Sequence, residues 1–170
     1  MSPPQNPGGE YVPDPSPSAA KRAELIAEIA ALPAKVRDLV AKLTPAQLDT
    51  KYKNWTVRQI VHHLADSHAN AYVRFKLALT ENNPTIKPYD ESKWAELPDT
   101  KSADIGPSLA MLEAVHARWV TVLKAMTDAD FTRKFTHPEF GKQFTLGETL
   151  GLYAWHGRHH PGQIAWLKKE

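Results

Sequence analysis

Apolar residues recur every three or four positions along four stretches of the chain, which is the spacing that places them on one face of an α-helix. The first predicted helix begins with Ser16 as its cap and Pro17 in its first turn. Its apolar face consists of Leu25, Ile26, Ile29, Leu32, Val36, Leu39, Val40 and Leu43. Pro33 lies inside this stretch, so a kink is expected there.

Two of the other stretches open on a capping-box pattern, in which a Thr and a Gln or Glu three residues later satisfy each other's backbone N–H groups. Thr56 and Gln59 predict the start of a second helix that continues to about Thr80. Thr145 and Glu148 predict the start of a fourth helix that runs toward the C-terminus. A third helix is predicted over residues 107–126 from its apolar stripe.

The segments between these helices have no helical pattern. Six of the fourteen prolines fall in the first eighteen residues, so residues 1–15 are predicted to form an extended arm. Residues 82–103 are expected to form a long crossover with one helical turn, and residues 131–144 are expected to form a short turn or hairpin. The fold class expected is all-α, a four-helix bundle formed by residues 16–170 as a single domain.

Composition narrows the class of protein. The net charge is only +2 and 24% of the residues are charged, so neither a nucleic acid nor a membrane surface is an expected partner. The chain has no cysteine, which leaves histidine, carboxylate and hydroxyl groups to carry any chemistry. The opening residues lack the basic and apolar regions of a secretory leader, and a cytoplasmic location is the expectation.

Six of the eight histidines fall in two short segments, HHLADSH at 62–68 and WHGRHH at 155–160. His156 and His160 are four residues apart, so they lie on one side of the fourth helix and could bind the same ion. His159 is expected to point away from the apolar face. A pair at this spacing also recurs by chance, so the decisive feature is a third histidine on another helix.

The spacing in the second helix does not identify that third residue. The apolar stripe places His68 at its centre and His63 at its edge, and the two are equally good candidates. His68 could instead be a core histidine hydrogen-bonded to a neighbouring helix, and His62 falls on the opposite side as a solvated or supporting residue.

The segments WTVRQIVHHLADSHANAYVRFKLALTENNPTIKPYDESKWAEL and LYAWHGRHHPGQIAWL resemble the DinB superfamily, in particular its YfiT-like branch of metal-dependent hydrolases, which includes bacillithiol transferases. The resemblance extends over nearly the whole chain. It implies an up-down-down-up bundle with a long crossover between helices two and three, a homodimer, and one nickel or zinc ion on His63, His156 and His160. The resemblance, and not the spacing, selects His63. Pro161 departs from the branch and predicts a kink just after His160.

Three neutral imidazoles leave a coordination position free, whereas a structural site is normally closed by four protein ligands. The bound ion would activate water, or a small-molecule thiol, for attack on an electrophilic small-molecule substrate. The functional hypothesis is therefore a metal-dependent hydrolase or a bacillithiol-type S-transferase. The alternative is a non-catalytic, metal-binding helical interaction module, which predicts a fourth protein ligand or no access to the ion.

Other polar residues near His63 are candidates for supporting roles. His62, Asp66 and Asn70 could orient a ligand imidazole, although a solvated polar face explains Asp66 equally well. Arg74 could bind an anionic group of a thiol cofactor or could be a plain surface charge. Trp55, Trp119 and Trp155 are expected in the core or at a dimer interface.

Overall fold

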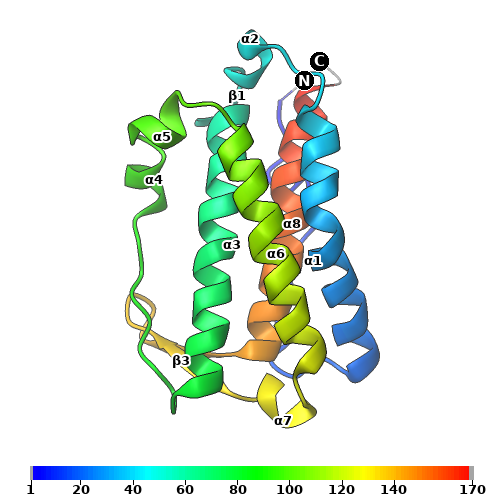
Figure 1. Cartoon of the computed structure of the whole chain (residues 1–170), viewed down its shortest axis with the longest axis vertical. Coiled ribbons are helices and arrows are strands. Elements are labelled where there is room, and N and C mark those ends of the chain that lie inside the picture. Colours follow the sequence, from blue (N-terminus) through cyan, green and yellow to red (C-terminus); the bar gives the residue numbers. More distant parts are fainter. Residues whose placement is uncertain (1, 169–170) are drawn as a thin grey trace.

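Four long helices run side by side along the length of the molecule in the computed structural model, which describes residues 2–168 (Figure 1). They are α1 (Ala19–Val40), α3 (Val57–Thr80), α6 (Gly106–Ala125) and α8 (Leu146–Leu167). In Figure 1, α1 runs upward, α3 and α6 run downward and α8 returns upward. This is the up-down-down-up four-helix bundle that was predicted. No helix within residues 2–168 has both the length and the apolar character needed to span a bilayer.

The long crossover follows from this topology. Because α3 and α6 point the same way, the chain between them must return along the whole bundle, and it does so on one side of the molecule (Figure 1). It contains two short helices, α4 (Glu91–Trp94) and α5 (Pro98–Lys101), where one helical turn was expected.

The helix starts are set by local hydrogen bonds. At α3 the predicted capping box is complete, since the Thr56 side chain accepts from the Gln59 N–H and Gln59 Oε1 accepts from the Thr56 N–H at 2.9 Å. At α8 only half of the box forms, because the Glu148 carboxylate instead accepts from Lys142 Nζ at 3.0 Å. The predicted start of α1 was wrong by two residues: Ser18, not Ser16, caps it by accepting from the Lys21 N–H.

The remaining elements are short and lie at the ends of the bundle. At one end, α2 (Pro45–Leu48) precedes the paired strands β1 (Lys51–Tyr52) and β2 (Trp55–Thr56). At the other end, α7 (Asp128–Phe131) leads into the antiparallel pair β3 (Lys134–His137) and β4 (Lys142–Thr145), which confirms a hairpin within residues 131–144.

The core is divided into two apolar clusters by a layer of histidines. The cluster nearer α2 includes Val36, Ile60, Leu64, Leu112 and Ile164, and the other includes Phe75, Trp119, Leu123, Leu146 and Leu150. Buried His68, His116 and His160 fall between the cluster residues of their helices, whereas His63 is next to Leu64 of the cluster nearer α2. The candidate site is therefore built at the middle of the bundle.

The N-terminal arm lies along α8. Trp155 Nε1 donates to the Gly9 carbonyl at 2.8 Å, and the Tyr11 hydroxyl donates to the Glu148 carbonyl at 3.3 Å. Gly8 approaches α8 so closely that a Cβ there would be 2.6 Å from the backbone nitrogen of His159. The arm thus packs on the outer side of the helix whose inner side carries His156 and His160.

Candidate metal centre

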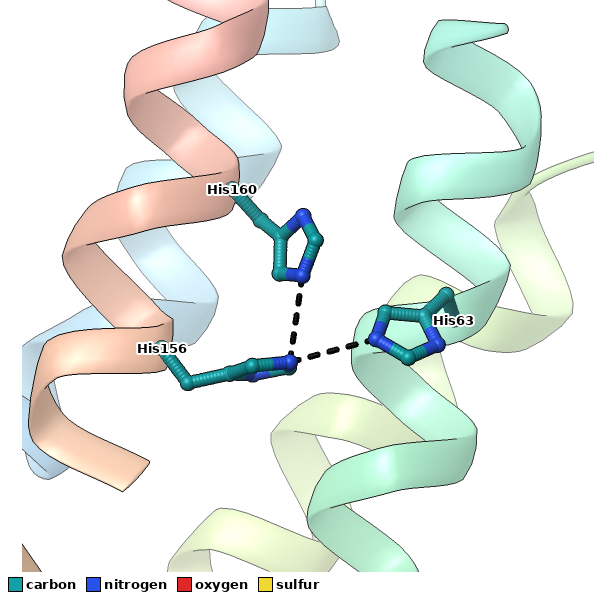
Figure 2. A group of neighbouring side chains, drawn as sticks. All are labelled: His63, His156 and His160. Atoms are coloured by element: carbon teal, nitrogen blue, oxygen red, sulfur yellow. Dashed lines mark hydrogen bonds between the residues drawn. The ribbon is translucent and has the colours of Figure 1, made fainter. Parts of the chain in front are cut away.

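Three imidazoles from two helices converge at the middle of the bundle (Figure 2). His63 comes from α3, and His156 and His160 come from successive turns of α8. The His156 Nε2 atom lies 3.1 Å from His63 Nε2 and 3.1 Å from His160 Nε2. One nitrogen of each ring lies within 4.8 Å of the others, which is compatible with all three binding one ion. The structure thus brings together the three residues that the family resemblance implied.

The protonation of these rings suits a cation. Burial lowers the pKa of His63 to about 4 and that of His160 to about 3. Burial and the neighbouring histidines also hold the pKa of His156 well below its usual value. Neutral imidazoles present lone pairs, and three lone pairs that face one another this closely are repulsive unless hydrogens or a cation lie between them. The residues present therefore fit a divalent metal ion.

The group of ligands stops at three. Among residues 2–168, no fourth histidine, aspartate or glutamate joins the cluster. His68, the alternative to His63, lies behind His156 instead, with its Nε2 atom 3.1 Å from His156 Nδ1. His68 also bonds His116 at 2.9 Å, so it is the core histidine bonded to a neighbouring helix that was considered for this position.

A glutamine supports His160, and sequence reasoning missed it. Gln163 Oε1 lies 2.8 Å from His160 Nδ1 and, being a carbonyl oxygen, accepts the Nδ1–H, which leaves the Nε2 lone pair for an ion. Its amide nitrogen lies 3.0 Å from His159 Nε2. Gln163 is three residues after His160, and this helical spacing was the signal that could have identified it.

The three supporting residues proposed from sequence do not contact the ligand rings. His62 bonds the Ser108 hydroxyl at 2.7 Å, and the Asn70 amide donates to the carbonyl of Asp66 at 2.9 Å. Burial, with a contribution from Asp99, raises the pKa of Asp66 to about 6. The hydrogen bonds of His62 and Asn70 thus go to Ser108 and to the α3 backbone, and not to a ligand imidazole.

Arg74 contacts Tyr153, which in turn packs against His156. It donates to the Tyr153 hydroxyl at 3.4 Å, and the Tyr153 ring packs 5.7 Å from the His156 ring. Arg74 is half-buried, and within the described part of the chain it forms no ion pair with a carboxylate. An unpaired, half-buried cation at this position is available to an anionic group.

A cavity of about 290 Å³ reaches the site beside His160. Its lining comprises Tyr52, Lys53, Asn54, Trp55, Ser92, His160 and Gln163. The Trp55 ring lies 4.6 Å from the His63 ring and stacks on the His160 ring at 6.4 Å with an interplanar angle of 17°. Trp55, which was expected in the core or at a dimer interface, packs against the cluster nearer α2 and also lies against two of the converging imidazoles. Of the three converging histidines, His160 is the one in the cavity lining.

The topology and the three converging imidazoles define a four-helix bundle with a candidate divalent-metal centre. Comparison with known proteins gives the family: the chain belongs to the DinB superfamily, whose profile matches residues 28–164.

Curated relatives carry names that agree with this centre. The chain is 48% identical over 165 residues to "Putative metal-dependent hydrolase YfiT" of Bacillus subtilis (strain 168), with 96% of this chain and 93% of the relative covered. It is 53% identical over 146 residues to a protein of the same description from Bacillus cereus (strain 03BB102), with 85% and 83% covered. The solved structure of YfiT from Bacillus subtilis matches with a TM-score of 0.93 at 48% identity, over 96% of this chain and 95% of that one. YfiT is described there as "a probable metal-dependent hydrolase with an unusual four-helix bundle topology".

Proposed function

We propose that this protein is a metal-dependent enzyme that holds one divalent ion, nickel or zinc, on His63, His156 and His160. The observation that carries the proposal is the convergence of three neutral imidazoles, without a fourth protein ligand in residues 2–168, beside a cavity. The non-catalytic alternative predicts a closed coordination sphere or a sealed site, and neither of these features is found in the described residues.

An ion bound there supplies a Lewis acid that activates water, or the sulfur of a small-molecule thiol, as a nucleophile at neutral pH. The protein's own groups do the positioning. Gln163 holds the His160 ring in one orientation, and Trp55 forms an apolar wall that limits the motion of a substrate in the cavity. The substrate approaches from the cavity side, because the rest of the bundle is packed around the ligands.

The names of the relatives support hydrolysis as the reaction, and the substrate we propose for it is an electrophilic small molecule. One specific observation favours thiol transfer as the second candidate. Arg74 is half-buried without a carboxylate partner in the described residues, and its contact Tyr153 packs on His156. Arg74 does not line the cavity beside His160, so an anionic low-molecular-weight thiol bound to Arg74 would have to extend past Tyr153 to bring its sulfur to the three histidines. The two reactions use the same site and differ only in the nucleophile.

Metal analysis and activity assays on protein purified without an affinity tag test the proposal. We expect one nickel or zinc ion per chain, retained in His62→Asn and lost in His160→Ala. His62 is a matched control, since it is a buried histidine adjacent to His63 that bonds Ser108 outside the centre. Full occupancy in His160→Ala would overturn the assignment of the ligands.

The assays would use ester and amide substrates alone, and alkylating electrophiles with an added anionic thiol. Turnover that depends on the metal and is lost in His160→Ala supports an enzyme. A requirement for thiol, together with a raised thiol KM in Arg74→Gln, would assign transfer instead of hydrolysis. Stoichiometric metal with no turnover in any of these reactions would favour the binding module.

A further inference from the structure

A continuous line of hydrogen-bonding groups crosses the bundle behind the metal centre. His156 Nδ1 lies 3.1 Å from His68 Nε2, and His68 Nδ1 lies 2.9 Å from His116 Nε2. The line ends where His116 Nδ1 lies 2.7 Å from the backbone carbonyl oxygen of Ile29. The four residues belong to α8, α3, α6 and α1, so each helix of the bundle contributes one member.

The Ile29 carbonyl oxygen is free to accept a hydrogen bond from His116 because of a proline in α1. In a regular helix the carbonyl of Ile29 would accept the N–H of residue 33, but Pro33 has no N–H to donate. The α1 helix continues through Pro33, so the Ile29 carbonyl lies inside a helix without its helical donor. The His116 ring supplies the missing hydrogen bond.

The carbonyl gives the whole line a direction. A carbonyl oxygen only accepts, so His116 must carry its hydrogen on Nδ1. A neutral imidazole has one donor and one acceptor, and His116 Nε2 therefore accepts from His68 Nδ1–H. By the same reasoning His68 Nε2 accepts from His156 Nδ1–H. The lone pair of His156 is then left on Nε2, the atom that lies 3.1 Å from the Nε2 atoms of His63 and His160.

We propose that His68 and His116 are positioning residues which, anchored on the Ile29 carbonyl, hold His156 in the Nδ1–H tautomer and so direct its Nε2 lone pair at the metal position. Metal-bound histidines usually donate their second N–H directly to a carbonyl or a carboxylate. Here two further imidazoles lie between the ligand and the carbonyl. The part of this inference that concerns metal binding rests on the proposed function. The part that concerns the His156 tautomer does not, because the metal-free protein has a tautomer as well.

The surroundings of the His68 and His116 rings leave few other hydrogen-bond partners for them. His68 is 0% exposed and His116 is 2% exposed. Neither ring is bonded to a carboxylate in the part of the chain that the structure describes, and the rings of Trp119 and Tyr153 pack roughly perpendicular to His68. If His116 carried its hydrogen on Nε2, its Nδ1 lone pair would face the lone pairs of the Ile29 oxygen at 2.7 Å. That arrangement is repulsive, and it would leave the His116 Nδ1 atom and the Ile29 carbonyl oxygen buried without a hydrogen bond.

Nitrogen NMR of the imidazole rings in the metal-free protein tests the tautomers directly. Long-range proton–nitrogen correlation spectra distinguish a ring nitrogen that carries hydrogen from one that carries a lone pair. We expect His116, His68 and His156 all to be Nδ1–H at neutral pH in the wild-type chain. A hydrogen on Nε2 of His156 or of His116 would overturn the proposal, and this measurement requires no variant to fold.

Three variants then test what the line does for metal binding, measured as zinc affinity by competition with a chelator. His116→Phe keeps a ring but removes the acceptor for His68, so we expect a mixture of His156 tautomers and a loss of about 10- to 100-fold in affinity. His116→Gln offers an amide donor to the carbonyl and an amide oxygen to His68, and should restore the Nδ1–H tautomer and most of the affinity. His62→Phe removes a buried and hydrogen-bonded histidine outside the line, and it should retain both the Nδ1–H tautomer of His156 and the zinc affinity.

An unchanged His156 tautomer in His116→Phe, or an equal loss of affinity in His62→Phe, would show that the line has no orienting role. The failure of the proposed function is distinguishable from these results. If the wild-type chain bound no divalent ion, the metal assignment would fall while the tautomer spectra still decided the present proposal. If the chain bound zinc but His156 were Nε2–H without it, only the present proposal would fall.

Discussion

His63 and His156 bring their Nε2 atoms to within 3.1 Å of each other although 93 residues separate them in the chain. His63 is on α3, which runs down the bundle, and His156 is on α8, which runs back up (Figure 1). An ion bound to both would connect α3 to α8 and would favour the folded state, because the unfolded chain does not hold these residues together.

Metal should therefore raise the thermal stability of the wild-type protein. At a free zinc concentration a thousand times the Kd, binding stabilises the fold by about 4 kcal/mol, which for this size corresponds to a rise in Tm of roughly 8–16 °C. In His63→Ala only two ligands remain, and we expect most of this rise to be lost. Thermal unfolding followed by circular dichroism with and without zinc measures the difference. A full rise in His63→Ala would contradict the role of His63.

The metal-free protein should lose stability in mild acid. Burial lowers the pKa of His116 from 6.5 to about 4. Between these pH values the unfolded chain binds a proton that the folded chain does not, so the free energy of unfolding falls as the pH falls from 6.5 toward 4. For His116 alone the loss at pH 5 is on the order of 2 kcal/mol.

His63 and His160 act in the same direction, because burial lowers their pKa values to about 4 and about 3. Unfolding by urea in the presence of a chelator, repeated from pH 8 to pH 5, checks this expectation. His116→Gln removes one titrating group and should make the pH dependence shallower. A flat profile in the wild-type chain would show that these histidines are not buried as neutral rings.

The charged Asp66 carboxylate should destabilise the folded protein at neutral pH. Burial and Asp99 raise its pKa from 3.8 to about 6. The folded state therefore binds more protons than the unfolded state between these values, and stability declines as the pH rises through that window. Asp66→Asn removes the charge and should stabilise the protein at pH 7.5 by about 1 kcal/mol, once solvent screening of this half-buried group is allowed for.

Asp99→Asn is the companion variant, because it removes the neighbouring charge and leaves Asp66 in place. It should give a smaller gain in the same direction, visible in the same urea titrations. Destabilisation by Asp66→Asn at pH 7.5 would mean that the carboxylate has a stabilising partner and would reopen the supporting role first considered for it.

The N-terminal arm offers a test of packing through its glycine. In Gly8→Ala the new Cβ would lie 2.6 Å from a backbone atom of α8, so the arm must shift away from the helix. We expect a loss of about 1–3 kcal/mol and a change in the fluorescence of Trp155, whose Nε1 donates to Gly9.

Gly151→Ala is the matched control, since that glycine lies within α8 and a Cβ there meets nothing within 4 Å. It should be neutral or stabilising by up to about 1 kcal/mol, the difference in helix propensity. Equal behaviour of the two variants in thermal unfolding would show that the arm is not held against α8 at Gly8.

The sequence by itself determined the features that depend on nearby residues. Thr56 and Gln59 cap α3 through bonds that span three residues, and His156 and His160 share a helix face because of their spacing. Four apolar stripes predicted four long helices, and the family resemblance gave their order. Each of these signals is local or is carried by a motif, so it can be read without knowing how the helices pack.

Only the tertiary structure decided which face of α3 meets α8. His63 and His68 are five residues apart, about 140° around the helix, and the apolar stripe did not distinguish them. Packing turned His63 toward His156 Nε2 and placed His68 between His156 and His116. The same holds for the Ile29 carbonyl, whose partner is 87 residues away. Such contacts arise where separate helices fill one core, and the free energy that selects them belongs to the whole bundle instead of to any one segment.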